Sequence, residues 1–256
     1  MSVAAEPSSR LAIRPDDEPG TMKLGRWLFA LLATACLVVL CWAFIDRPVA
    51  LWLHAHRLFE FGRSTFRPLT HVPDPLIPLG AIAFIVLAMW AMAGRKLTKF
   101  SSLIVVCCFS VMTTETMKNG LKWIFGRPWP DSWHGNEPSL IRNGDYRFHW
   151  FDGGSGYNSF PSGHMAATMA VLAVLWIYYP RWRPACVTIA VLVAAGLIGS
   201  NFHFVGDVLA GAFLGSAVAW MAVSVFDQYP NGWRSEHPKR EMRGRALHPN
   251  CHDEAG

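Results

Sequence analysis

Six apolar stretches, each close to the length of a membrane-spanning helix, constrain this chain more than any other feature. They run approximately over Trp27–Phe44, Leu76–Ala93, Ser101–Phe125, Met165–Tyr179, Cys186–Phe202 and Val208–Phe226. About 20 helical residues cross a hydrocarbon core of about 30 Å, and only helices or closed barrels satisfy the backbone there. The sequence therefore predicts an all-α, polytopic membrane protein built as a bundle of six transmembrane helices.

The composition agrees with a chain that has the bilayer as its solvent. Hydrophobic residues make up 52% and charged residues 16%, and the mean hydropathy is +0.23, which is too apolar for an ordinary soluble domain. Small residues in AGAFLGSAVA, residues 210–219, favour close helix contacts. The six cysteines lie mostly in apolar spans, so we expect small hydrophobic side chains rather than extracellular disulfides or zinc ligands.

The polar segments divide the chain into three parts. Residues 1–22 and 229–256 are predicted to be disordered tails, the second of them basic. Residues 23–228 form the membrane domain. Within it, residues 47–68 mix aromatic and basic residues, as a connector in the membrane interface does. Residues 131–160 are rich in aromatic residues and glycine, which suits either the headgroup belt or a cover over a site, and the sequence leaves both open.

Lysine and arginine are distributed unequally between the two sides of the predicted bundle. With the N-terminus inside, fourteen of them fall in inner segments and seven in the two long outer segments. Inner loops keep an excess of positive charge, so both termini are predicted to be cytoplasmic in a bacterial inner membrane. The first apolar stretch is expected to stay as an anchor. This bias accounts for the net charge of +5, so no nucleic-acid partner is predicted, and the oligomeric state is left open.

Polar residues gather at the ends of the spans on the predicted outer, periplasmic side. Lys122 and Arg127 lie where the third span ends, and prolines follow them. Taken alone, such cations are commonly interfacial side chains that reach for water. Glu115 lies one helical turn from Lys118, and we expect these two to pair as structural support.

The segment Pro161-Ser162-Gly163-His164 stands at the start of the fourth span. Proline and serine at a helix start leave backbone N–H groups that attract anions such as phosphate. Gly163 allows a ligand to approach the main chain closely. For these four residues alone, an ordinary helix cap with an interfacial histidine is the alternative.

His203 and Asp207 are four residues apart and would share one face of a helix. A carboxylate there holds the imidazole in one tautomer, as a histidine nucleophile or base requires; a satisfied polar pair is the alternative. Together with His164, Lys122 and Arg127, the pair favours phosphoryl transfer. One histidine would attack phosphorus and the other would protonate the leaving oxygen. A zinc site is less favoured because the two cations oppose a second positive charge.

These motifs resemble those of the type 2 phosphatidic acid phosphatase family, which shares a superfamily with the vanadium haloperoxidases. The family pattern is Lys, six residues, Arg-Pro; then Pro-Ser-Gly-His; then Ser-Arg, five residues, His, three residues, Asp. The resemblance covers about residues 101–226 and implies an acid phosphatase/haloperoxidase-like helical core without a metal cofactor. The implied roles are His203 as the nucleophile that forms a phosphohistidine, Asp207 as its orienting carboxylate, His164 as the general acid, and Ser162, Gly163 and Lys122 as phosphate ligands.

Two arginines of the family pattern are replaced. Trp129 stands where the first motif has its arginine, and Gly-Leu at 196–197 stands where the third has Ser-Arg. A lost charge-assisted contact to a developing oxyanion commonly costs about 10²- to 10³-fold in rate. Arg127 is expected to take over part of the phosphate binding, and Arg142 or Arg147 of the outer loop is a further candidate.

The predicted function is hydrolysis of a lipid phosphomonoester or pyrophosphate at the periplasmic face, through a phosphohistidine and without a cofactor. The partners are a lipid phosphate substrate and the bilayer. A lipid phosphotransferase, or a non-catalytic protein that retains the fold, is the alternative. Undecaprenyl pyrophosphate, phosphatidic acid, phosphatidylglycerol phosphate and a lipid A phosphate are candidate substrates, and the sequence does not choose among them.

Overall fold

The computed structural model describes residues 24–57, 60, 73–95, 97–132, 137–154 and 156–227, and these form helices and no strand. The predicted all-α class is therefore confirmed for this part of the chain. The α-helices are α1 (Leu24–Leu40), α2 (Asp46–Ala55), α4 (Pro73–Met92), α5 (Lys99–Phe125), α6 (Leu140–Asn143), α7 (Gly163–Tyr178), α8 (Arg183–Gly199) and α9 (Val205–Asp227). A π-helix, Cys41–Ile45, joins α1 to α2, and a 3₁₀ turn, Pro180–Trp182, precedes α8.

Four of the described helical segments are long and apolar enough to cross a membrane: Gly25–Ala55, Lys99–Phe125, Pro180–Gly199 and Val205–Asp227. Two more apolar helices, Pro78–Met92 and Gly163–Tyr178, are shorter. The chain is thus a multi-pass membrane protein, and the count of six spanning helices stays a prediction.

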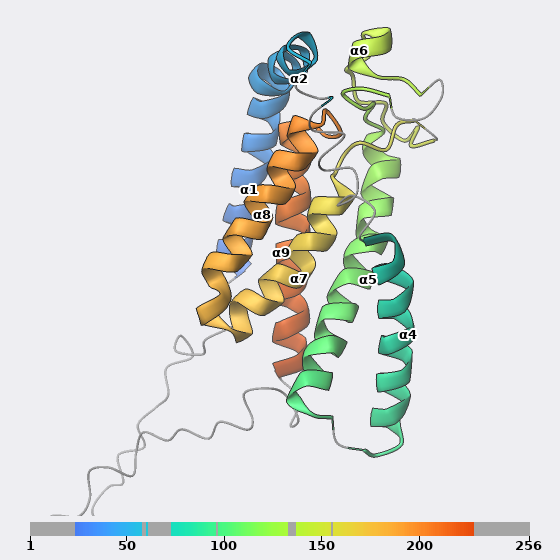
Figure 1. Ribbon diagram of the computed structural model, residues 1–256, viewed down its shortest axis with the longest axis vertical. Coiled ribbons are helices and arrows are strands. Elements are labelled where there is room, and N and C mark those ends of the chain that lie inside the picture. The colour runs from blue at the N-terminus through green and yellow to red at the C-terminus, as the bar shows by residue number, and fades with distance from the viewer. Residues whose placement is uncertain are drawn as a thin grey trace, which may run out of the picture.

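The first predicted span, Trp27–Phe44, lies within a helical segment that runs on past its end. The helix continues to Ala55 because the apolar π-helical segment keeps the backbone hydrogen-bonded between α1 and α2. The first part of the predicted connector, residues 47–68, is helical and belongs to α2, which turns away from the axis of α1 (Figure 1). The rest of that connector lies largely outside the described residues, as do the predicted tails, residues 1–22 and 229–256.

Helix α9 lies at the centre of the bundle, where it packs against α1, α5 and α7 (Figure 1). Helix α7 also contacts α5 and α8, and α4 lies on the outer side of α5. Consecutive long helices alternate in direction, so the start of α1 and the end of α9 lie at one end of the bundle. The long connection between α5 and α7, which carries α6, lies at the opposite end.

Two glycines allow α7 and α9 to approach closely. A Cβ atom on Gly211 would lie 2.4 Å from the carbonyl oxygen of Ser162, and one on Gly215 would lie 2.1 Å from that of Ala166. Both distances are too short for any side chain, so the small residues of segment 210–219 make the contact that the sequence predicted. This contact also fixes where α7 begins relative to α9.

Gly211→Ala is expected to lower the thermal unfolding midpoint in detergent, because the added methyl group must push two backbones apart. Overpacking of this kind costs about 1 to 3 kcal/mol. Gly120→Ala in α5 is the matched control, since a Cβ there meets nothing within 4 Å. Alanine is the better helix former by about 1 kcal/mol, so the control should be neutral or stabilising. Equal midpoints for the two variants, followed by tryptophan fluorescence, would contradict the close contact.

Helix α8 ends at Gly199, three residues before the predicted end of that span at Phe202. Residues 200–204 form a turn in which Asn201 has a φ of 56°. The carbonyl oxygen of Leu197 accepts hydrogen bonds from the backbone N–H groups of Phe202 and His203, at 3.0 and 3.2 Å. His203 therefore lies in a turn held by the end of α8 and does not share a helix with Asp207.

Candidate active site

Three motifs that are far apart in the sequence meet where α5 ends and α7 and α9 begin. Arg127 follows α5, Ser162 caps α7, and Asp207 lies in the first turn of α9. The backbone N–H of Ser162 donates to the carbonyl oxygen of Asp207 at 3.0 Å, which joins the second and third motifs directly. The predicted convergence of these segments is what the structure contains.

His203 and Asp207 lie together, although His203 precedes the helix. His203 Nδ1 is 3.6 Å from Asp207 Oδ2, and both side chains are buried. The Ser159 hydroxyl lies beside them, donating to Asp207 Oδ2 at 2.6 Å and standing 3.4 Å from His203 Nδ1. Because Nδ1 faces a carboxylate and a hydroxyl, Nε2 is the ring nitrogen that remains to react with a substrate.

The Asp207 carboxylate is fixed on both of its oxygens. Oδ1 accepts from Arg127 Nη1 at 2.6 Å, and Oδ2 accepts from the backbone N–H of Phe204 at 3.1 Å. Charge-assisted hydrogen bonds of this length hold their partners in one geometry. Asp207 can therefore keep the His203 ring in a single orientation.

Arg127, which the sequence predicted to bind phosphate, is fully buried between two carboxylates. Its Nη1 binds Asp207, and its Nη2 donates to Asp46 Oδ2 at 2.8 Å. The rings of Phe204, Phe148 and Tyr146 surround the guanidinium carbon at 4.1, 5.1 and 5.4 Å. Direct phosphate binding by Arg127 stays a prediction, and both terminal nitrogens already have anionic partners.

Ser162 is the N-cap residue of α7, as the sequence predicted. Its side chain accepts a hydrogen bond from the backbone N–H of Met165 at 3.4 Å, and the residue is fully buried. Gly163 begins the helix, and a Cβ there would lie 2.9 Å from Lys118 Cδ and 3.2 Å from Lys118 Nζ. The start of α7 thus meets a lysine of α5, a combination that suits an anion.

Lys118 also forms the predicted ion pair with Glu115 of the same helix. The pair therefore does more than support α5, because it places an ammonium group beside Gly163. Sequence reasoning missed this position because it shows which residues share a helix face, and not which neighbouring helix that face meets.

His164 lies across the site from His203. Their ring centroids are 6.3 Å apart, and the Phe202 ring lies 5.5 Å from His164 and 5.3 Å from His203. The two imidazoles come from different segments, the first turn of α7 and the turn before α9. The structure therefore brings the two predicted catalytic histidines close to one another.

Trp129, which stands where the family pattern has an arginine, packs against the aromatic rings of the site. Its ring lies 5.0 Å from the His203 ring and 5.4 Å from that of Phe202. Lys122 Nζ lies 5.8 Å from the Trp129 ring centroid, within the range of a cation–π contact. The Trp129 ring therefore contacts both the predicted phosphate ligand Lys122 and the predicted nucleophile His203.

Leu197, at the other replaced position, is a core residue. It is buried with Met165 and Val208 between α7, α8 and α9. Its side chain therefore supports the packing, and its carbonyl oxygen positions the turn that carries His203.

Burial sets the protonation preference of His203, which lies outside the membrane-spanning segments. Desolvation lowers the pKa of His203, the hydrogen bond and charge of Asp207 oppose that shift, and the positive charge of Lys122 adds to it. The lowered pKa keeps the imidazole neutral, which is the form that can attack. For Arg127, burial opposes the charge, but Asp207 and Asp46 outweigh it and raise the pKa of the guanidinium.

Two site residues have no counterpart in the motifs that were recognised in the sequence. Ser159 lies three residues before Ser162, and its hydroxyl contacts both Asp207 and His203. Asp46 comes from the start of α2 and is about 80 residues away from Arg127 in sequence. A polar residue next to an apolar stretch was the available signal for Asp46, but nothing in that signal names its partner.

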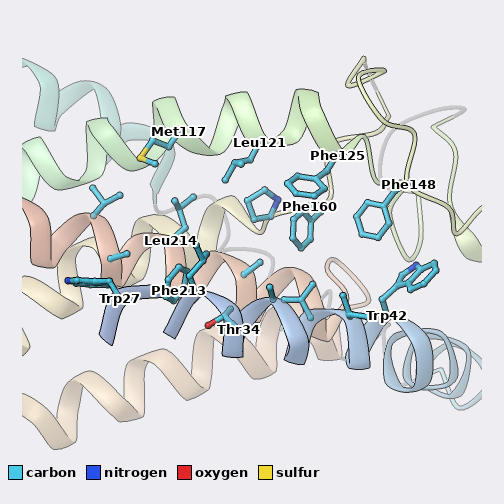
Figure 2. A pocket seen from close by; sticks show the side chains of 18 of the residues that line it. Trp27, Thr34, Trp42, Met117, Leu121, Phe125, Phe148, Phe160, Phe213 and Leu214 are labelled. Carbon is cyan, nitrogen blue, oxygen red and sulfur yellow. The ribbon is translucent and has the colours of Figure 1, made fainter. Parts of the chain in front are cut away.

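A large apolar groove runs along the bundle beside the site. It holds about 1150 Å³ and is lined by α1, α5, α9 and the segment before α7. Figure 2 shows Leu121 and Phe125 of α5, Phe213 and Leu214 of α9, and Trp27 of α1 among the side chains that line it. Among the described residues that line it, Arg147 is the one charged side chain.

The outer loop packs over this end of the bundle. Phe148 and Phe160 pack edge-to-face against Phe125 at the end of α5, at centroid distances of 6.0 and 4.9 Å. Trp150 and Phe151 are more than half exposed. Of the two predicted compensating arginines, Arg147 lines the groove and Arg142 lies in α6.

The described cysteines are all free, and Cys251 lies outside the described residues. Among the described residues, no group of three or more His, Cys, Asp or Glu side chains is arranged to hold a metal ion.

The chain is similar in sequence to known proteins of one family. The model of the PAP2 superfamily matches residues 102–230. A lipid A 1-phosphatase of Rhizobium johnstonii is 26% identical over 230 residues, which covers 81% of this chain and 87% of that protein. A lipid A 1-phosphatase of Rhizobium etli is 28% identical over 227 residues, with 81% and 91% covered. No solved structure gives a significant match.

The family match spans more than half of the chain and includes both histidines, Asp207 and the N-cap of α7. The resemblance read from the motifs is thereby confirmed, and the chain belongs to the PAP2 superfamily.

Proposed function

We propose that this chain is a membrane lipid phosphatase that hydrolyses a phosphate ester of a lipid through a phosphohistidine. The observation that carries the proposal is the pair of histidines 6.3 Å apart, with the Asp207 carboxylate behind His203 Nδ1. The lipid A 1-phosphatases among its relatives support a phosphorylated lipid as substrate.

In the first step, His203 Nε2 attacks phosphorus, and a P–N bond forms as the P–O bond to the lipid breaks. The leaving lipid oxygen takes a proton from His164. In the second step, water attacks the phosphohistidine, His164 accepts the water proton, and His203 is regenerated with release of inorganic phosphate. Asp207 stabilises the positive charge that develops on His203. The start of α7, Lys118 and Lys122 stabilise the phosphoryl oxygens.

The apolar groove supports a lipid substrate. Phe160 and Pro161, directly before the N-cap residue Ser162, are part of its lining, so the groove passes beside the proposed phosphate site. Its apolar lining suits acyl chains, and Arg147 in that lining suits an anionic headgroup. The proposed occupant is an acyl chain of the substrate.

The proposed setting is a bacterial inner membrane with the site on the periplasmic side. The structure places the start of α1 and the end of α9 opposite the candidate site. The excess of Lys and Arg in the segments at that end supports a cytoplasmic location for both termini.

The test is phosphate release from lipid phosphates by the purified full chain in detergent, with a chelator present. Lipid A 1-phosphate, phosphatidic acid, phosphatidylglycerol phosphate and undecaprenyl pyrophosphate form the panel. We expect release from at least one substrate without added metal. No release from any of them would overturn the proposal. Appearance of a phosphorylated lipid acceptor instead of inorganic phosphate would show transfer rather than hydrolysis.

A variant of the groove belongs to the same test. Ala217→Trp places a large ring in the groove and should raise KM for the long-chain substrate several-fold, with kcat little changed. A short-chain, water-soluble form of that substrate is the control, and its KM should not move. Equal KM changes for both forms would contradict acyl-chain binding in the groove.

A further inference from the structure

Asp46 is a buried carboxylate that none of the recognised motifs includes. It is 1% exposed and lies before the first residue of the PAP2 match, residues 102–230. Burying a charged group in the membrane domain is costly unless partners compensate it. Its burial at this place therefore calls for specific partners.

The two oxygens of Asp46 hold two parts of the active site. Oδ2 accepts from Arg127 Nη2 at 2.8 Å, and Oδ1 accepts from the backbone N–H of Gly206 at 2.9 Å. Gly206 immediately precedes Asp207 in the first turn of α9, where backbone N–H groups lack helical partners. Asp46 thus contacts Arg127, which binds Asp207, and also contacts the backbone immediately before Asp207.

Local structure directs Asp46 to this position. The π-helix Cys41–Ile45 ends immediately before it, and a π-helical turn changes the direction in which the following side chains point. Gly206 leaves space for the carboxylate, because a Cβ there would lie 3.0 Å from Asp46 Oδ2 and 3.5 Å from the Cβ of Cys41. The first membrane helix is thereby joined to the start of α9 at the active site.

These contacts form a chain that leads to the reacting histidine. Asp46 binds Arg127, Arg127 binds Asp207, and Asp207 lies against Ser159 and His203. Arg127 has both terminal nitrogens engaged and is fully buried. It is therefore suited to fix Asp207.

The geometry points to Asp46 as a positioning residue of the phosphatase site, which fixes Arg127 so that Arg127 holds the Asp207 carboxylate toward His203. This inference rests on the proposed function and assigns Arg127 to the same chain of contacts. It adds a residue of the first membrane helix to the catalytic arrangement.

The test compares wild type with Asp46→Asn on a lipid phosphate that the wild type hydrolyses. The amide keeps the size of the side chain and an oxygen acceptor, and Arg127 remains paired with Asp207, so the variant should fold. We expect kcat to fall about 10- to 100-fold, as for other groups that orient a catalytic ligand. KM should change little, because Asp46 does not face the substrate.

A second readout is the acidic limb of the kcat/KM profile. The groups that face His203 are Asp207, Ser159, Lys122, Trp129 and His164. Loss of the Asp46 charge leaves more positive charge beside Asp207, which disfavours the imidazolium. The acidic limb of the kcat/KM profile should therefore move to lower pH in Asp46→Asn. The loss of a merely structural residue would not cause this shift.

Asp145→Asn is the matched control, since Asp145 Oδ2 is hydrogen-bonded to His149 Nε2 in the outer loop at 2.9 Å. It should leave kcat and the acidic limb unchanged. Activities are expressed per folded protein, measured by the thermal unfolding transition. An Asp46→Asn kcat within twofold of wild type, or a loss explained by the folded fraction alone, would overturn the inference while the proposed function stands. Absence of hydrolysis in the wild type would instead overturn the proposed function.

Discussion

Replacement of His203 by alanine is expected to reduce phosphate release by about 10⁴-fold or more, because no other group can take the place of a lost nucleophile. The residual rate would come from substrate binding and from the cations of α5. The measurement is phosphate release from the best lipid substrate, combined with trapping of ³²P on the enzyme in an alkaline quench, where phosphohistidine is stable. Label on the alanine variant at the wild-type level would contradict the assignment of the nucleophile.

His164→Ala separates the two histidines. A general acid matters most when the leaving oxygen is a poor leaving group, so this variant should lose most of its activity on a lipid phosphate. On an aryl phosphate, whose oxygen leaves without a proton, the first step should recover. Because His164 also activates the water in the second step, hydrolysis of the phosphohistidine should be slow in this variant. Enzyme carrying ³²P from the labelled aryl phosphate should therefore accumulate. His203→Ala should fail with both substrates, and similar behaviour of the two variants would contradict the division of roles.

The parts of the site that depend on short stretches of sequence were predictable. Pro161 to His164 indicated a helix start, and Ser162 indeed caps α7. The spacing of His203 and Asp207 indicated a pair, which the structure contains at 3.6 Å. The reason given was incomplete, because the pair is made by a turn held on Leu197, and not by one helix face.

The contacts between helices were not predictable from the sequence. Arg127 at the end of a span carries the same signal whether it reaches for phosphate, for water or for a carboxylate. Its partner Asp46 lies beyond the predicted end of the first span at Phe44, and only the π-helix and the packing of α1 on α9 bring the two together. Hydropathy predicts which segments cross the membrane but not which faces meet, so the place of Lys118 beside Gly163 and the contacts of Ser159 were also missed.

Asp207→Asn is expected to lower kcat by about 10⁴-fold, the effect of the same exchange in a serine protease triad, where the histidine loses its correct tautomer. The variant should stay folded, since Arg127 retains Asp46 as an anionic partner. Protein with a wild-type unfolding transition and wild-type turnover would contradict the orienting role of Asp207.

The pH dependence of this variant gives the sharper test, because its sign follows from the electrostatics of His203. Burial already lowers the pKa of His203 below its ordinary value of 6.5, and Asp207 opposes that shift. The attacking imidazole must be neutral, so the acidic limb of kcat/KM in the wild type should lie below pH 6.5. Removing the Asp207 charge removes the opposing effect and leaves the charges of Arg127 and Lys122, which both disfavour the imidazolium. The acidic limb of the kcat/KM profile should therefore lie at lower pH for Asp207→Asn than for the wild type. Both enzymes are measured on the same substrate, so ionisation of the substrate affects the two profiles equally. A limb that moves to higher pH would show that Asp207 acts on a different group.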